Sequence, residues 1–144
     1  MKKYFLTAIF SALILTGCSV DNNNPTPQVV IAHWNLIKTT GGVAGVNHTF
    51  PLKTVIWTFD EANLKLTVVN NNTDDTKQDA LDSGTYDYSV AKNNDDSYLS
   101  ISENEFGGFK ITSSQLVIDQ NDLSQGSGAD GFVYTFQKTL ETAN

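Results

Sequence analysis

The sequence of 144 residues contains no arginine, so all nine of its cationic side chains are lysines, against 16 aspartates and glutamates. Its formal net charge is -7. A protein that binds nucleic acid needs a clustered basic surface to neutralise phosphates, and this composition does not supply one. The planar guanidinium group, which holds carboxylates and phosphates through two hydrogen bonds, is also missing. We therefore expect no nucleic-acid partner.

Cysteine is limited to one residue, Cys18, so no disulfide can form within the chain. Lys2 and Lys3 precede an apolar run over residues 4–15. The run is too short to cross about 30 Å of hydrocarbon as a helix, but its length is typical of the apolar region of a signal peptide. It ends in Leu-Thr-Gly-Cys at residues 15–18, which resembles the bacterial lipobox. An ordinary secretory signal with an incidental cysteine is the alternative.

The lipobox resemblance implies that a diacylglycerol is joined to the Cys18 sulfur and that the chain is cut just before it. We therefore expect a lipoprotein signal peptide at residues 1–17, then the lipidated cysteine and a flexible tether at 18–29. A folded domain is expected at 30–140. Acyl chains such as palmitate would anchor the protein to a membrane of the bacterial cell envelope, expected to be the outer membrane. The periplasmic and surface faces stay open. Because the domain is acidic, we expect it to contact the bilayer through the lipid alone.

After residue 30 the apolar side chains recur with a period of two, which is typical of half-buried β-strands, and no sustained helical period occurs. Short polar connections favour antiparallel neighbours, and closure of the sheet would remove its unpaired edges. We therefore predict an all-β fold, an eight-stranded up-and-down antiparallel barrel, with a two-sheet sandwich as the alternative. The expected strands are residues 30–38, 54–60, 64–69, 85–90, 98–102, 107–112, 115–120 and 131–138.

The order of several segments supports this fold. They are Trp34, WTFDE at 57–61 with LKLTV at 64–68, SGTY at 83–86, GGFKI at 107–111 with LVI at 116–118, and FVYTFQK at 132–138. In this order the chain resembles lipocalin-like domain lipoproteins of Bacteroidota-type bacteria over about residues 31–138. The resemblance implies a small calycin-type barrel that binds a lipophilic ligand. The chain departs from lipocalins proper because Ala32 replaces the glycine of their Gly-x-Trp signature and no arginine is present to stack on Trp34.

The predicted inward face contains no charge, so a small hydrophobic ligand is the expected partner if the barrel is hollow. The alternative is that the bulky rings fill the barrel, which would leave a structural or interaction module of the envelope. No cofactor is expected. The candidate ligand-binding residues are Trp34, Trp57, Phe59, Tyr86, Tyr88, Phe109, Phe132, Tyr134 and Phe136.

No pattern of residues indicates an enzyme. His33 and His48 have no nucleophile or metal-ligand motif beside them and are expected to be surface imidazoles. The acidic loops lack the ligand spacing of a calcium site, so we expect no metal. Three longer polar loops, at 39–52, 70–83 and 121–130, are candidates to form or gate the mouth of the barrel. The meander pattern alone does not place all three at one end.

Overall fold

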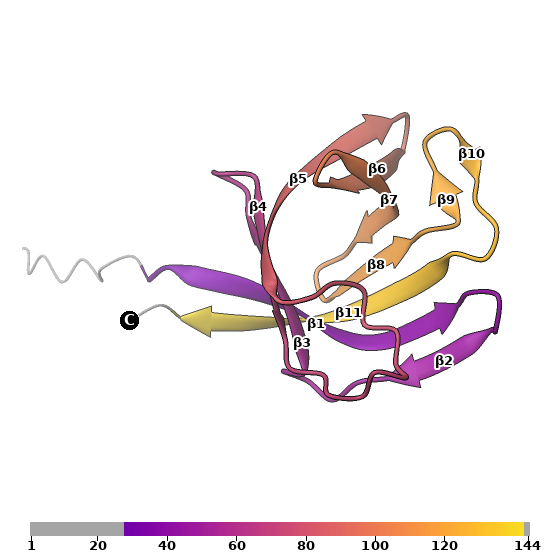
Figure 1. Ribbon diagram of the computed structural model, residues 1–144. Helices are drawn as coiled ribbons and strands as arrows, with labels where there is room; N and C mark the ends of the chain where they lie inside the picture. The colour runs from indigo at the N-terminus through magenta and orange to yellow at the C-terminus, as the bar shows by residue number, and fades with distance from the viewer. Residues whose placement is uncertain (1–27, 143–144) are drawn as a thin grey trace, which may run out of the picture.

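The computed structural model describes residues 28–142, and every regular element in that range is a β-strand. Figure 1 shows their arrangement. The strands are β1 (Val30–Gly41), β2 (Val46–Thr49), β3 (Val55–Asp60), β4 (Lys65–Asn70), β5 (Gly84–Asn93), β6 (Asp96–Ile101), β7 (Asn104–Ile111), β8 (Gln115–Asp119), β9 (Asp122–Leu123), β10 (Gly126–Ser127) and β11 (Phe132–Thr142).

Eight of these strands close into an antiparallel barrel in the order β1-β3-β4-β5-β6-β7-β8-β11. Strand β11 then pairs with β1 along its whole length, from Val30 opposite Thr142 to Gly41 opposite Phe132. Consecutive barrel strands are neighbours throughout, so the predicted eight-stranded up-and-down barrel is confirmed and the sandwich alternative is excluded. Because all barrel pairings lie within residues 30–142, this segment contains every strand partner that the fold requires.

Two of the expected loops contain short strands. Strand β1 continues past residue 38 to Gly41, and its last four residues pair with β2. The β-branched Thr39 and Thr40 favour this extension, and Gly42 and Gly45, both at positive φ, form the turn that follows. In the loop at 121–130, β9 and β10 form a second small hairpin.

The core follows the predicted alternation, with two interruptions. A register shift between Leu36 and Lys38 in β1 turns Thr39 inward, where it is fully buried. A second shift lies where β6 pairs with β7 and places Phe106, which the alternation pattern missed, against the core. Such β-bulges insert one residue and move the following side chains to the opposite face. The buried apolar core consists of Trp34, Leu36, Phe50, Val55, Trp57, Leu66, Val68, Tyr88, Tyr98, Leu99, Ile101, Leu116, Ile118, Tyr134 and Phe136.

The two ends of the barrel differ. One end carries the connections β1–β3, β4–β5, β6–β7 and β8–β11, so all three long loops lie there together. This end is covered, because Phe50, Ala80 and Leu81 from the loops pack against the core. The opposite end carries only short turns and both termini of the described chain, which lie side by side on β1 and β11 (Figure 1). We call these the loop end and the terminal end.

Candidate functional site

The terminal end of the barrel is hollow. A cup of about 970 Å³ opens there, near the upper limit of the range of about 300–1,000 Å³ for small-molecule sites. The loops expected to gate a mouth lie at the opposite end, so that expectation is wrong. The cup is lined by Val29, Val30, Ile31, Ala32, Trp34, Thr58, Phe59, Asp60, Glu61, Leu64, Tyr88, Val90, Phe109, Ile111 and Lys138.

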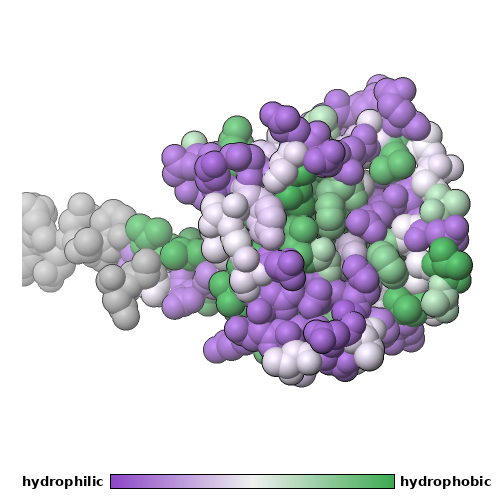
Figure 2. Space-filling view, in the orientation of Figure 1, coloured by the Kyte–Doolittle hydropathy of each residue, from purple (hydrophilic) through white to green (hydrophobic). Residues whose placement is uncertain are grey.

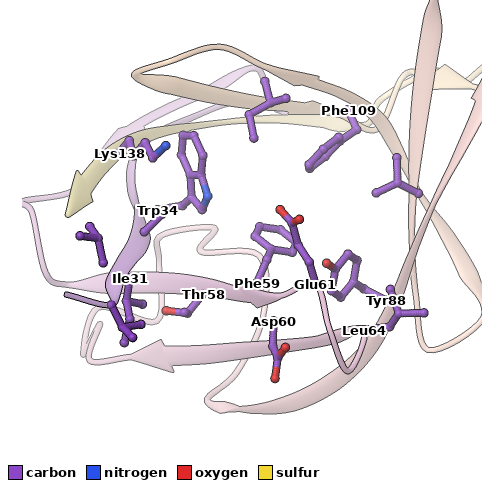
Figure 3. Close-up of a pocket in the computed structure, with 15 residues that line it drawn as sticks. Ile31, Trp34, Thr58, Phe59, Asp60, Glu61, Leu64, Tyr88, Phe109 and Lys138 are labelled. Atoms are coloured by element: carbon purple, nitrogen blue, oxygen red, sulfur yellow. The ribbon is translucent and has the colours of Figure 1, made fainter. Parts of the chain in front are cut away.

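Four aromatic side chains form the inner wall of the cup. Figure 3 shows the rings of Trp34, Phe59, Tyr88 and Phe109 turned toward one common space. The ring of Phe59 lies edge-on to those of Tyr88 and Phe109, with centroid distances of 5.0 Å and 6.0 Å. Edge-to-face pairs of this kind stabilise ring orientation beyond the burial of their area. The wall is therefore a preformed apolar surface.

A second group of aromatic side chains fills the barrel beyond the cup. The ring of Trp57 lies 4.9 Å from that of Phe136 and 6.0 Å from that of Phe106, which stacks on Tyr134 at 5.9 Å. Phe59, 6.3 Å from Trp57, separates this plug from the cup. The sequence left open whether the barrel is hollow or filled by aromatic rings, and each alternative applies to one half of it. The half toward the loop end is filled, and the half toward the terminal end is open.

The nine predicted ligand-binding residues divide accordingly. Four line the cup: Trp34, Phe59, Tyr88 and Phe109. Three lie in the plug, namely Trp57, Tyr134 and Phe136. The remaining two, Tyr86 and Phe132, pack on the edge of the core and do not line the cup. The lipidation candidate Cys18 lies outside the described residues.

The cup also uses side chains that sequence reasoning did not select. Val29, Val30 and Ile31 form part of its rim, at the point where the tether was expected to end. The signal in the sequence that could have identified these rim residues is the run of three apolar residues at the start of a strand. Leu64, Val90 and Ile111 also line the cup, and they are exposed because the terminal end is open above them.

Few polar groups reach the cup. The ammonium group of Lys138 lies over the ring of Trp34, 5.5 Å from the centroid, a distance typical of cation–π contacts. Burial raises the pKa of the Tyr88 phenol, and the neighbouring carboxylates of Glu61 and Asp60 raise it further. The Tyr88 hydroxyl therefore stays neutral at physiological pH and is available as a hydrogen-bond donor or acceptor.

In the wall of the cup, the backbone pairing between β1 and β3 is short. These two strands pair at only two positions, Trp34 opposite Trp57 and Asn35 opposite Ile56. Beyond them the start of β1 pairs only with β11, and the end of β3 only with β4. A hydrogen bond of 2.7 Å between His33 Nδ1 and Thr58 Oγ1 joins the two strands next to their paired residues.

His33 and His48 are both partly exposed on the outside of the barrel, and each has hydrogen-bond partners that the sequence did not indicate. Besides Thr58, His33 contacts Glu141 through Nε2 at 3.0 Å and so connects β1, β3 and β11 on the outside of the barrel. His48 Nδ1 accepts a hydrogen bond of 3.0 Å from the Gln78 amide and joins β2 to the β4–β5 loop. Within residues 28–142, no three His, Cys, Asp or Glu side chains come together as a potential metal site.

Comparison with known proteins yielded no match to a protein family, a curated protein or a solved structure. The resemblance to lipocalin-like lipoproteins therefore stays a prediction, and the barrel itself is the finding. In the described part of the chain, no helix combines the length and the apolar character needed to span a membrane.

Proposed function

We propose that this protein is a lipoprotein of the bacterial cell envelope, anchored through Cys18, whose lipocalin-like barrel binds a small hydrophobic ligand in the cup at its terminal end. The observation that supports the proposal is the cup itself, an open space of about 970 Å³ with four aromatic rings in its wall. A closed and fully filled barrel would offer no such surface.

The lining of the cup indicates the chemistry of the ligand. Apolar and aromatic side chains predominate, so binding would be driven by removal of apolar surface from water. The polar groups of the lining that are available to orient a ligand are few: the Tyr88 hydroxyl, the Glu61 carboxylate and the ammonium group of Lys138. An apolar molecule with one polar group fits this arrangement best. No cofactor and no catalytic step form part of the proposal.

Placing a carboxylate inside the cup tests the proposal. Val90 lines the cup and is 38% exposed, whereas Val69, on the outside of β4, is 43% exposed. We expect Val90→Glu to weaken binding of a fatty-acid probe at least about tenfold, or about 1.4 kcal/mol, because the ligand would desolvate the charge. The matched variant Val69→Glu should bind like the unmodified protein. Binding is measured by titration of a segment spanning residues 19–144.

The aromatic plug favours a second candidate, a structural or interaction module of the envelope that has no small-molecule ligand. Trp57, Phe106, Tyr134 and Phe136 give the barrel a rigid centre whether or not the cup is occupied. Native mass spectrometry of the same segment, purified without detergent, separates the two. A co-purified apolar mass supports the ligand-binding function. A bare polypeptide that also fails to bind the probe supports the second candidate.

A further inference from the structure

The exposed apolar side chains of this protein gather around the cup. Six of the ten large apolar residues that residues 28–142 expose are on its rim or wall: Val29, Val30, Ile31, Leu64, Val90 and Ile111. Figure 2 shows apolar side chains directly beside the grey atoms, where the described chain begins. A cluster of this kind on a protein of this size marks a surface that contacts something other than water.

The charges at the rim are few, and most of them are carboxylates. The Asp60 carboxylate forms its hydrogen bonds within its own turn. It accepts them from the backbone amides of Ala62 and Asn63 and from the Asn63 side chain. It points away from the cup in Figure 3. Glu61 and Lys138 contribute one charge of each sign to the lining. The β5–β6 turn at this end adds Asp95 and Asp96. Such a rim suits a zwitterionic surface better than an anionic one.

The chain outside the described residues leaves from this same rim. Val29 lines the cup, and the expected lipid anchor at Cys18 precedes it by 11 residues. A chain of that length spans at most about 40 Å. The anchor would therefore hold the apolar rim within about 40 Å of the bilayer and would raise the local concentration of membrane lipid at the cup.

We propose that the cup faces the bilayer and takes up one acyl chain of a zwitterionic membrane phospholipid. This inference rests on the proposed ligand-binding function and deepens it. The rim residues Val30 and Ile111 contact the bilayer, the acyl chain lies against Trp34 and Phe109, and the headgroup stays outside at the level of Glu61 and Lys138. The domain then contacts the membrane directly and not through its lipid anchor alone.

The experiment uses residues 19–144 without the lipid, so that only the barrel can bind the membrane. Trp57→Phe leaves Trp34 as the only tryptophan, since the sequence contains two. Vesicles of phosphatidylcholine carry a nitroxide on one acyl chain, and a soluble nitroxide-labelled fatty acid serves as the second probe. Flotation reports binding to vesicles, and quenching of Trp34 fluorescence reports an acyl chain in the cup. We expect flotation together with quenching, and weaker flotation with vesicles that contain anionic lipid.

Two matched variants test the orientation. Ile111, on the rim, is 55% exposed, and Val43, at the loop end, is 87% exposed. Because both are on the surface, an aspartate at either position leaves the core intact. We expect Ile111→Asp to lower vesicle binding about tenfold, since a charge would have to leave water at the membrane contact. Val43→Asp should have no effect.

The remaining outcomes overturn the inference in distinguishable ways. Quenching by the soluble fatty acid without flotation supports the proposed ligand-binding function and contradicts the membrane contact. Flotation without quenching contradicts the uptake of an acyl chain in the cup. An equal loss of vesicle binding for both aspartate variants contradicts the proposed orientation. If the protein forms a concentration-dependent dimer and does not bind vesicles, and if Ile111→Asp prevents dimerisation, a second copy covers the rim. If neither probe quenches Trp34 and no vesicles float, the proposed function fails as well.

Discussion

At the scale of single residues, Trp57 determines how much of the barrel is hollow. Its side chain is completely buried and contacts the rings of Phe59, Phe106 and Phe136. Among residues 28–142 its indole N–H has no hydrogen-bond partner. The tryptophan therefore contributes through its volume and not through a polar contact. A smaller residue here would extend the cup toward the loop end.

We expect Trp57→Ala to lower the free energy of unfolding by about 3–5 kcal/mol, the usual cost of truncating a large buried aromatic side chain. Trp57→Phe should cost clearly less, because it keeps a ring and removes an N–H that has no partner. Urea unfolding followed by circular dichroism measures both. Equal losses for the two variants would show that the indole N–H does have a partner.

Tyr134 provides a prediction about pH. Burial raises the pKa of its phenol above the ordinary value of about 10, although a hydrogen bond with Gln78 opposes the shift. Above pH 10 the unfolded chain loses this proton before the folded chain does. The stabilisation is therefore complete below pH 10 and is lost as the pH rises toward the folded pKa.

The urea midpoint, measured between pH 8 and 11, should fall with rising pH, and it should fall less steeply in Tyr134→Phe. Lysines and the other tyrosines titrate in both proteins, so the difference between the two slopes isolates Tyr134. Identical slopes would mean that the phenol ionises as easily in the folded protein as in the unfolded chain.

At the scale of elements, the β4–β5 loop closes the barrel. Leu81 and Ala80 pack on the core, the Lys77 ammonium donates to the Thr49 carbonyl at 3.1 Å, and the Gln78 amide donates to His48. The loop is thus held both by apolar contacts and by hydrogen bonds to β2. Its position at the loop end makes it part of the structure that supports the plug, not a gate to the cup.

We expect Leu81→Ser to lower the free energy of unfolding by about 1–3 kcal/mol, because a partly buried apolar contact with the core is lost. Affinity for the fatty-acid probe should stay unchanged, since the cup is at the other end. Leu52→Ser, at a 48% exposed position of the same end, is the matched control and should leave stability almost unchanged. A loss of probe affinity in Leu81→Ser would restore the gating role.

At the scale of the whole molecule, the described chain begins and ends at the end of the barrel where the cup opens. Both termini of the described chain are at the terminal end, and the rim of the cup includes Val29. In the proposed membrane orientation, the loop end, with its polar loops, faces away from the bilayer. This arrangement follows from an even number of strands in an up-and-down barrel, which returns the chain to the end where it started.

Lipidation of Cys18 is tested in bacterial cells. The unmodified protein should fractionate with membranes and incorporate labelled palmitate, and Cys18→Ser should do neither, because the thiol that accepts the diacylglycerol is gone. Ser19→Ala, next to the same site, should keep both properties. Membrane fractionation of Cys18→Ser without label would instead indicate an uncleaved signal segment.

Much of the barrel was predictable because alternation is a local property of a strand. Strands at 54–60 and 115–120 were found close to their true bounds, and the order of neighbours followed from short connections. The bulges were not predictable, since one inserted residue is invisible in the alternation until the partner strand is known. For this reason Thr39 and Phe106 were missed as inward-facing residues.

The absence of arginine, the single cysteine and the period of two thus determined the class of protein: an acidic all-β domain without disulfides, behind a lipobox-like segment. Only the tertiary structure decided which half of the barrel is filled. That outcome depends on rings from β3, β7 and β11, up to 79 residues apart, meeting around Trp57. Contacts between distant residues depend on closure and register, which no local pattern specifies.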